Sequence, residues 1–348
     1  MADTFESLAL VPKATTPLTA KDFKTDQEVR WCPGCGDYAI LAAVQSFLPE
    51  LGVARENITF ISGIGCSSRF PYYVDTYGMH SIHGRAPAIA TGLSITRPDL
   101  SVWVVTGDGD ALSIGGNHLI HAMRRNVNLK ILLFNNRIYG LTKGQYSPTS
   151  EPGKITKSTP YGSLDHPFNP VSLALGVECT FVARTMDSDR KHLIETLRAA
   201  AAHEGTAIVE IMQNCDIFND GAWAPLKDAA TREDNLIRLE HGQPILVGED
   251  KAVLREPHGP MYVGTVTPEN EAQVVVHNAT MDDPSTAFRL SRLSDPFTLE
   301  HTAIGVFRDV KRPVFDRELQ GQIDTVTQKL GKGEFDRLLR SADTWEIK

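Results

Sequence analysis

The chain is poor in the features that mark membrane proteins, secreted scaffolds and nucleic-acid-binding proteins. Its 348 residues contain no run of about 18 apolar side chains, so no membrane-spanning helix is predicted. Residues 1–6 lack the basic start and apolar core of a secretory signal. Acidic side chains outnumber basic ones by 43 to 35, which argues against a basic surface for nucleic acid or anionic lipid. We therefore expect a cytoplasmic protein that binds neither nucleic acid nor membrane.

Cysteine is also scarce, with five residues in the whole chain. In a reducing compartment so few cysteines do not indicate a disulfide framework, which leaves metal binding or simple burial. Cys32 and Cys35 form a C-x-x-C pair, whereas Cys66, Cys179 and Cys215 stand alone. Cys179 is predicted to lie inside a strand as a buried structural thiol. The other four cysteines are candidate metal ligands.

Apolar runs alternate with helical periodicity over much of the chain. Runs that are apolar nearly throughout predict strands covered on both faces, as in a parallel sheet. The predicted strands are 58–62, 102–106, 129–134, 177–183 and 207–212. The predicted helices are 38–47, 85–96, 113–125, 170–175 and 189–202. The fold class is therefore α/β, a doubly wound parallel sheet.

The same patterns divide the chain into three parts. Residues 1–30 are polar, contain Pro12 and Pro17, and are predicted to form an N-terminal arm. Residues 31–218 carry the α/β alternation. Residues 219–348 are predicted to be a small appended region, with short β-like runs and a helix at 314–330.

Four segments directly follow predicted strands and carry side chains suited to ligand binding. They are Gly65-Cys66, Gly107-Asp108-Gly109, Asn135-Asn136 and Asn214-Cys215. In open α/β sheets the crevice at the carboxyl ends of the strands binds ligands, so these segments are expected to lie close together.

The Gly-Asp-Gly segment has the chemistry of a diphosphate site. Gly107 and Gly109 let the backbone approach a phosphate, and a helix expected near Ser113 would present free N–H groups to it. A magnesium ion that bridges two phosphates needs about six oxygen ligands, and Asp108 supplies one. The side-chain amide of Asn136 and the main-chain carbonyl of Ile138 are candidates for two more. Gly-Asp-Gly alone is also a common turn; its pairing with Asn135-Asn136 makes the signal specific.

These motifs resemble those of a known family. Gly107-Asp108-Gly109 with Asn135-Asn136 is similar to the thiamine diphosphate motif. The segments 31–36, 83–86 and 139–149 resemble those of β subunits of 2-oxoacid:ferredoxin oxidoreductases, and the likeness extends over about 29–220. The resemblance implies a thiamine diphosphate-binding fold, a Mg²⁺ ion and one [4Fe-4S] cluster. Beyond Asp108, Asn136 and Ile138, the expected cofactor-binding residues are Gly107, Gly109, Asp110, Gly140, Leu141 and Thr142.

The four candidate cysteines fit an iron-sulfur cluster better than zinc. Zinc ribbons repeat a close cysteine pair, whereas here Cys66 and Cys215 are single residues on distant loops. A nearby cluster could remove electrons singly from a thiamine-bound substrate, with coenzyme A as acyl acceptor and ferredoxin as electron carrier. No second thiamine-binding half is evident, so the resemblance implies an α subunit that supplies it, in an αβ or (αβ)2 assembly.

Substrate preference is assigned to Lys143. In Thr142-Lys143-Gly144-Gln145 the ammonium group is expected beside the reaction centre, where it could bind a distal carboxylate; this favours 2-oxoglutarate. A solvated loop lysine is the simpler alternative. His83 and Arg85 precede a predicted helix near the crevice and are candidates for cofactor or substrate contact, although helix capping or a subunit contact explains them equally well.

The sequence is also compatible with other substrates and other functions. The substrate could be pyruvate or a branched-chain oxoacid. The chain could belong to a non-oxidative thiamine enzyme in which the cysteines are incidental, or to a structural zinc-binding module in which Gly-Asp-Gly is only a turn.

Overall fold

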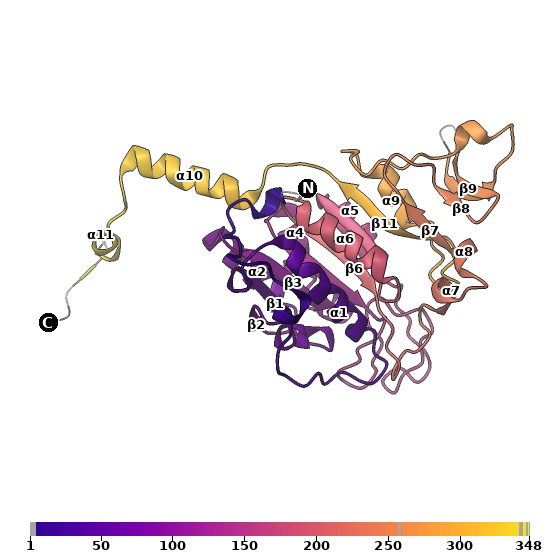
Figure 1. Cartoon of the computed structure of the whole chain (residues 1–348), viewed down its shortest axis with the longest axis horizontal. Helices are drawn as coiled ribbons and strands as arrows, with labels where there is room; N and C mark the ends of the chain where they lie inside the picture. The colour runs from indigo at the N-terminus through magenta and orange to yellow at the C-terminus, as the bar shows by residue number, and fades with distance from the viewer. Residues whose placement is uncertain (1–4, 257–258, 341–343, 346, 348) are drawn as a thin grey trace.

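The computed structural model describes residues 5–256, 259–340, 344–345 and 347. An eight-stranded sheet forms its centre, in the order β2-β1-β3-β4-β6-β5-β11-β7 (Figure 1). Neighbouring strands are parallel, except that β11 is antiparallel to β5. The strands are β1 (Ile58–Ser62), β2 (Tyr77–His80), β3 (Ser101–Gly107), β4 (Lys130–Asn135), β5 (Phe181–Met186), β6 (Ala207–Met212), β7 (Leu236–Leu239) and β11 (Thr302–Asp309).

Helices cover both faces of this sheet, which confirms the predicted α/β doubly wound class. They are α1 (Asp37–Phe47), α2 (Ala86–Thr96), α3 (Asp108–Leu112), α4 (Gly116–Arg125), α5 (Pro170–Gly176), α6 (Arg190–Ala202) and α9 (Ser285–Ser291). Successive residues of one strand point to opposite faces. Leu132 of β4 therefore packs in the apolar cluster of α1 and α6, and Leu133 in that of α2, α4 and α5.

The predicted strand at 177–183 was placed too early. After α5 ends, Glu178 adopts a left-handed φ of 57°, and β5 begins only at Phe181. The prediction that Cys179 lies inside a strand is therefore wrong, because the alternating apolar residues at this point form a turn. Its burial is confirmed: Cys179 is fully buried, and its thiol donates to the carbonyls of Phe181 and Thr206.

The predicted helix at 113–125 is observed as α4, which begins three residues later, at Gly116, and a separate short helix, α3, precedes it and ends at Leu112. At the break between them a Cβ on Gly115 would lie 2.4 Å from the carbonyl oxygen of Asp110, so only glycine fits. Helix α3 consequently begins at Asp108, directly after β3. The first free N–H groups of a helix after β3 therefore belong to residues from Asp108 onward, and not to residues near Ser113 as expected.

The regions on either side of 31–218 both pack against it. Phe5, Leu8 and Phe23 of the arm are buried in the same cluster as α1. From the appended region, β7 and β11 join the central sheet, so this part of 219–348 completes the sheet rather than lying apart from it. A smaller sheet lies beyond them in the order β10-β9-β8, with helices α7 (Ala224–Lys227) and α8 (Arg232–Asn235) nearby. Its strands are β8 (Leu246–Val247), β9 (Lys251–Arg255) and β10 (Met261–Thr265).

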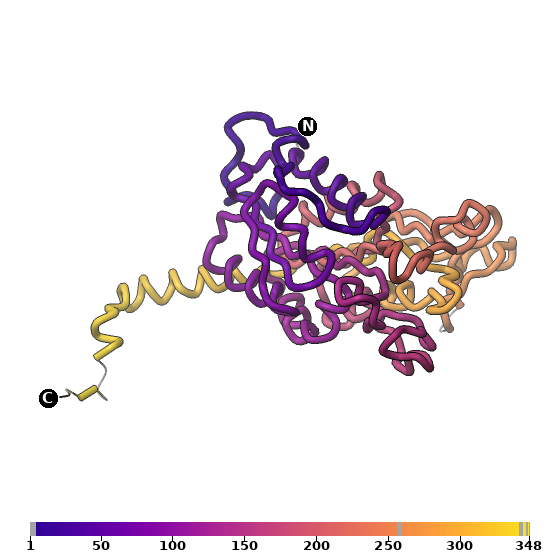
Figure 2. The backbone as a smooth tube through the Cα atoms, turned by 90° about the horizontal axis from the view of Figure 1, so that it is seen from below, coloured from indigo at the N-terminus to yellow at the C-terminus, as the bar shows by residue number. Residues whose placement is uncertain are grey.

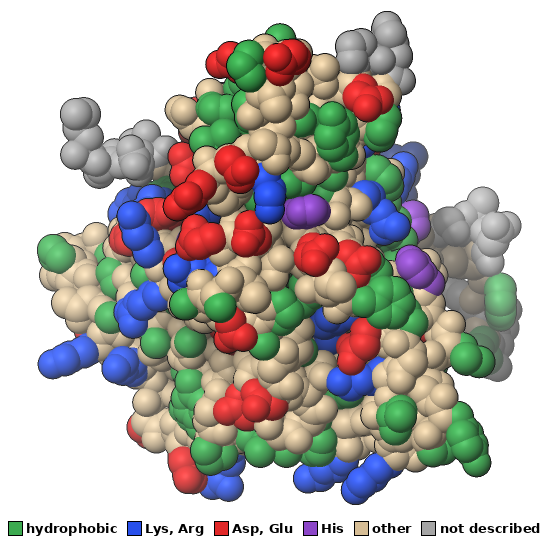
Figure 3. Space-filling model, turned by 90° about the vertical axis from the view of Figure 1, so that its right-hand side faces the viewer, with side chains coloured by type: hydrophobic (Ala, Val, Ile, Leu, Met, Phe, Trp, Pro, Cys, Tyr) green, Lys and Arg blue, Asp and Glu red, His purple; other side chains and the backbone are tan. Residues whose placement is uncertain are grey.

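The last helices extend away from the body. Helix α10 (Phe315–Leu330) confirms the predicted helix at 314–330, and α11 (Phe335–Leu339) follows it outward (Figures 1 and 2). Acidic and basic side chains are interspersed on the face that carries the smaller sheet (Figure 3). Among the residues that the structure describes, no helix is long and apolar enough to cross a membrane.

Candidate active site

A pocket of about 520 Å³ opens at the carboxyl ends of β1, β3 and β4. It brings together loops that lie far apart in sequence, as the parallel sheet predicts. Its walls are formed by Ile64, Gly65, Cys66, Ser67, His83, Gly107, Asp108, Gly109, Asp110, Phe134, Asn136, Ile138, Tyr139, Gly140, Leu141, Thr142, Gln145 and Tyr146. Every residue predicted to bind thiamine diphosphate or magnesium is in this set.

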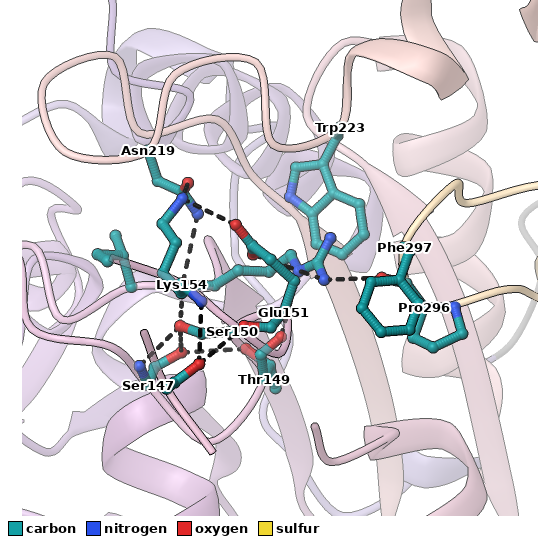
Figure 4. Close-up of polar contacts among 12 residues, drawn as sticks. Ser147, Thr149, Ser150, Glu151, Lys154, Asn219, Trp223, Pro296 and Phe297 are labelled. Carbon is teal, nitrogen blue, oxygen red and sulfur yellow. Dashed lines mark hydrogen bonds and ion pairs between the residues drawn. The ribbon is translucent and has the colours of Figure 1, made fainter. Parts of the chain in front are cut away.

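Asp108 is held rigidly at the base of the pocket. Ser147 and Thr149, both labelled in Figure 4, donate to its Oδ2 atom at 2.5 and 2.6 Å. Burial raises the pKa of Asp108 to about 6, against the opposing effect of these hydroxyls. A buried carboxylate of this kind is stabilised by a cation, which fits the predicted magnesium ligand. The adjoining Gly109 packs against the ring of Tyr139, where a Cβ would overlap the ring.

The turn after β4 carries the other two predicted magnesium ligands. Arg137 has a φ of 58°, which reverses the chain and presents Asn136 and Ile138 to the pocket. The side-chain oxygen of Asn136 accepts a hydrogen bond from the Ile138 N–H at 3.1 Å. Amide and carbonyl oxygens therefore lie on the same wall as Asp108, a set of hard donors that suits magnesium.

Asp110 organises the loops around the pocket. Its buried Oδ1 atom accepts the N–H groups of Ile64 and Gly84, at 3.1 and 2.7 Å. The same atom lies 2.5 Å from Nδ1 of His83, and Thr106 donates to the other oxygen. A carboxylate at Nδ1 keeps the proton there and leaves Nε2 of His83 as an acceptor. Asp110, predicted as a cofactor ligand, thus uses its carboxylate on the protein itself.

The four candidate cysteines converge beside this pocket. A Cβ on Gly140 would lie 3.3 Å from the sulfur of Cys66 and 3.7 Å from that of Cys215. Burial raises the pKa of Cys66 to about 12, and the nearby charges of Asp37, Cys215 and Cys32 add to the effect. The pKa of Cys35 is raised for similar reasons, burial first. Thiolates that are buried and repel one another in this way are stabilised by a bound metal, so the donor set fits an iron-sulfur cluster.

No three His, Cys, Asp or Glu side chains in the described part of the chain are grouped closely enough to hold a single metal ion. The cluster site therefore depends on two observations: Cys66 and Cys215 both lie beside Gly140, and the charges of Cys32, Cys35, Cys66 and Cys215 act on one another.

Two predicted catalytic residues lie outside the pocket lining. Arg85 is the N-cap of α2 and donates to the carbonyl of Ile114. Lys143 is exposed, beside the lining residues Leu141 and Thr142, and has a φ of 81°. A positive φ is unfavourable for lysine, and strained backbone of this kind clusters at functional sites. His83 is the predicted catalytic residue that does line the pocket.

Several site residues were missed from sequence. Ser147 and Thr149 orient Asp108, Gln145 and Tyr146 line the pocket, and Asn219 binds the turn after β4. Most of them lie in 139–149, the segment that resembled the family; hydroxyl residues so close to a diphosphate motif were the available signal. Asn219 had none, because its partners are distant in sequence.

Three comparisons with known proteins agree with this geometry. Residues 63–211 match the model of the thiamine pyrophosphate enzyme, C-terminal TPP binding domain. A 2-oxoglutarate oxidoreductase subunit KorB from Mycobacterium tuberculosis is 60% identical over 97% of this chain and 91% of its own length. A 2-oxoglutarate synthase subunit KorB from Archaeoglobus fulgidus is 38% identical over 65% of this chain and 85% of its own.

A solved structure is similar over the whole length. It is a 2-oxoglutarate:ferredoxin oxidoreductase from Magnetococcus marinus with 2-oxoglutarate, coenzyme A and succinyl-CoA bound. It is 32% identical, with a TM-score of 0.73 over 99% of this chain and 100% of that one. The chain therefore belongs to the 2-oxoacid:ferredoxin oxidoreductase β-subunit family, on the 2-oxoglutarate branch.

Proposed function

We propose that the chain holds thiamine diphosphate, Mg²⁺ and one [4Fe-4S] cluster. With coenzyme A, it would convert 2-oxoglutarate to succinyl-CoA and CO2 and pass the electrons to ferredoxin, reversibly and in the cytoplasm. The observation that carries this proposal is the shared wall of the two sites. Cys66 lines the pocket of Asp108 and Asn136, and Gly140, also in that lining, lies so near the cluster cysteines that a Cβ there would come within 3.3 Å of the Cys66 sulfur and 3.7 Å of the Cys215 sulfur.

Different residues of the pocket are proposed to hold the cofactor and to contact the substrate. Thiamine diphosphate, when bound, supplies the electron sink that makes loss of CO2 from a 2-oxoacid possible. Asp108, Asn136 and Ile138 would hold its diphosphate through magnesium. His83 lines the pocket and is oriented by Asp110 through Nδ1, so its Nε2 would be the atom that accepts a proton or a hydrogen bond from substrate.

An α subunit is proposed as the partner that closes the site. Apolar side chains stand exposed around the pocket: Ile82 precedes His83, Leu141 lines the opening, and Ile114 lies against Gly84. The edge strand β2 is exposed along its length. Exposed apolar patches beside a functional pocket mark protein contact sites. An αβ or (αβ)2 assembly would cover this surface.

The test is anaerobic purification of the chain with and without its α subunit. We expect about four irons per β chain and bound thiamine diphosphate. Ferredoxin reduction should require the α subunit, coenzyme A and 2-oxoglutarate. Turnover by the β chain alone would contradict the proposed partner, and a chain without iron would leave only the thiamine half of the proposal.

Lys143 is the proposed selector of 2-oxoglutarate. Lys143→Met removes the ammonium group but keeps a side chain at the strained backbone position. We expect the KM for 2-oxoglutarate to rise about tenfold, because one hydrogen bond to a charged group is lost. The KM for pyruvate should change little. Steady-state kinetics on both substrates measure this, and Lys143→Arg should restore much of the affinity. Equal effects on the two substrates would refute the role.

A further inference from the structure

Asn219 lies on the loop that carries the cluster cysteine Cys215. Its N–H donates to the carbonyl of Cys215 at 2.9 Å, which closes the loop Cys215–Asn219. Its side chain is buried and points toward Lys154, on the side of Ser147 and Ser150 (Figure 4). The residue is therefore bound to the Cys215 loop through its backbone, and its side chain is directed elsewhere.

The side-chain amide of Asn219 binds the magnesium-binding turn after β4. Its Nδ2 atom donates to the carbonyls of Asn136, at 2.9 Å, and Arg137, at 3.3 Å. Its Oδ1 atom accepts a hydrogen bond from Lys154, which also pairs with Glu151 at 2.9 Å. The donors and the acceptor of this amide are thus all engaged.

The same turn is tied to Asp108 by a second route. Ser150 donates to the carbonyl of Arg137 at 2.6 Å, and its hydroxyl accepts the N–H of Ser147 at 2.8 Å. Ser147 in turn donates to Asp108. The Cys215 loop, the turn after β4 and Asp108 are consequently members of one buried hydrogen-bonded network, in which a shift of one member strains the others.

We propose that Asn219 is a positioning residue that couples the cluster site to the diphosphate site, so that occupancy of each alters the other. The inference rests on the proposed function and deepens it. A coupling between two binding sites is reciprocal, and because Asn219 bonds to a loop of each site, we expect its substitution to disturb both cofactors. A role limited to either site would affect only that one.

Asn219→Asp tests the proposal in the αβ complex. The substitution keeps the shape and the acceptor for Lys154 but removes both donors and places oxygen against two carbonyls. We expect the Kd of thiamine diphosphate at fixed magnesium to rise about tenfold. We also expect the EPR spectrum and midpoint potential of the reduced cluster to shift. Calorimetry and redox titration measure these effects.

Asn214→Ala is the matched control. Asn214 lies in the same loop, but its side chain contacts Asp216, Asp220 and Gly221, none of which is in the diphosphate site. Its Kd for thiamine diphosphate should equal that of the wild type. An equal loss in Asn214→Ala, or an Asn219→Asp protein that is folded by circular dichroism and changes neither or only one readout, would overturn the coupling. Absence of iron or thiamine from the wild type would instead refute the proposed function.

Discussion

Asp108→Asn is expected to weaken the magnesium-dependent binding of thiamine diphosphate by more than about a hundredfold. Substitution of residues that only hydrogen-bond to metal ligands already reduces metal affinity by about 10- to 100-fold, so the loss of a ligand itself should have a larger effect. The substitution preserves shape but removes the charge that a divalent cation requires. Asp108 is buried and its Oδ2 is oriented by Ser147 and Thr149, so a neighbouring side chain cannot readily move in to replace it. Calorimetric titration of the αβ complex with the cofactor, at several magnesium concentrations, measures the loss.

Two controls make this result specific. Asp99→Asn changes an exposed carboxylate that pairs with Arg97 and should bind the cofactor normally. Thr149→Val removes one hydrogen bond to Asp108 and should give an intermediate loss of about tenfold or more. Iron content should be unchanged in all three proteins. Binding by Asp108→Asn within a few fold of the wild type would remove Asp108 from the proposed magnesium ligands.

Cys215→Ser is expected to abolish cluster assembly and with it ferredoxin reduction. Serine replaces a thiolate ligand with a hydroxyl that binds iron poorly, and the position is buried, so water cannot easily serve instead. Iron content should fall from about four per chain to near zero, and the EPR signal of the reduced cluster should vanish. Cys215 is not in the pocket lining, so thiamine diphosphate should still bind, with the altered affinity that coupling of the two sites predicts, and this retained binding separates the loss of iron from general unfolding.

Cys179→Ser is the control for that experiment. Cys179 is buried like Cys215 but lies between α5 and β5, with its thiol bonded to two carbonyls that a serine hydroxyl can also satisfy. This variant should keep its iron and its activity. Loss of iron in Cys179→Ser, or retention of iron in Cys215→Ser, would contradict the proposed ligand set.

The sequence by itself determined the fold class and the pocket residues expected to bind the cofactor and magnesium. The strands at 58–62 and 207–212 are observed at the residues predicted, because each is a mostly apolar run that is buried on both faces. Because parallel strands align their carboxyl ends, motifs placed just after them had to meet at one edge. The convergence of Asp108, Asn136 and Cys66 followed from spacing and topology alone.

Tertiary structure decided what depends on partners distant in sequence. The start of β5 at Phe181 and the break before Gly116 reflect local crowding and backbone reversal that apolar periodicity does not record. The entry of β7 and β11 into the sheet required pairing with strands from other parts of the chain. The role of Asp110 in orienting His83, and the link that Asn219 makes between the two sites, arise only where folded loops bring their hydrogen-bond partners together.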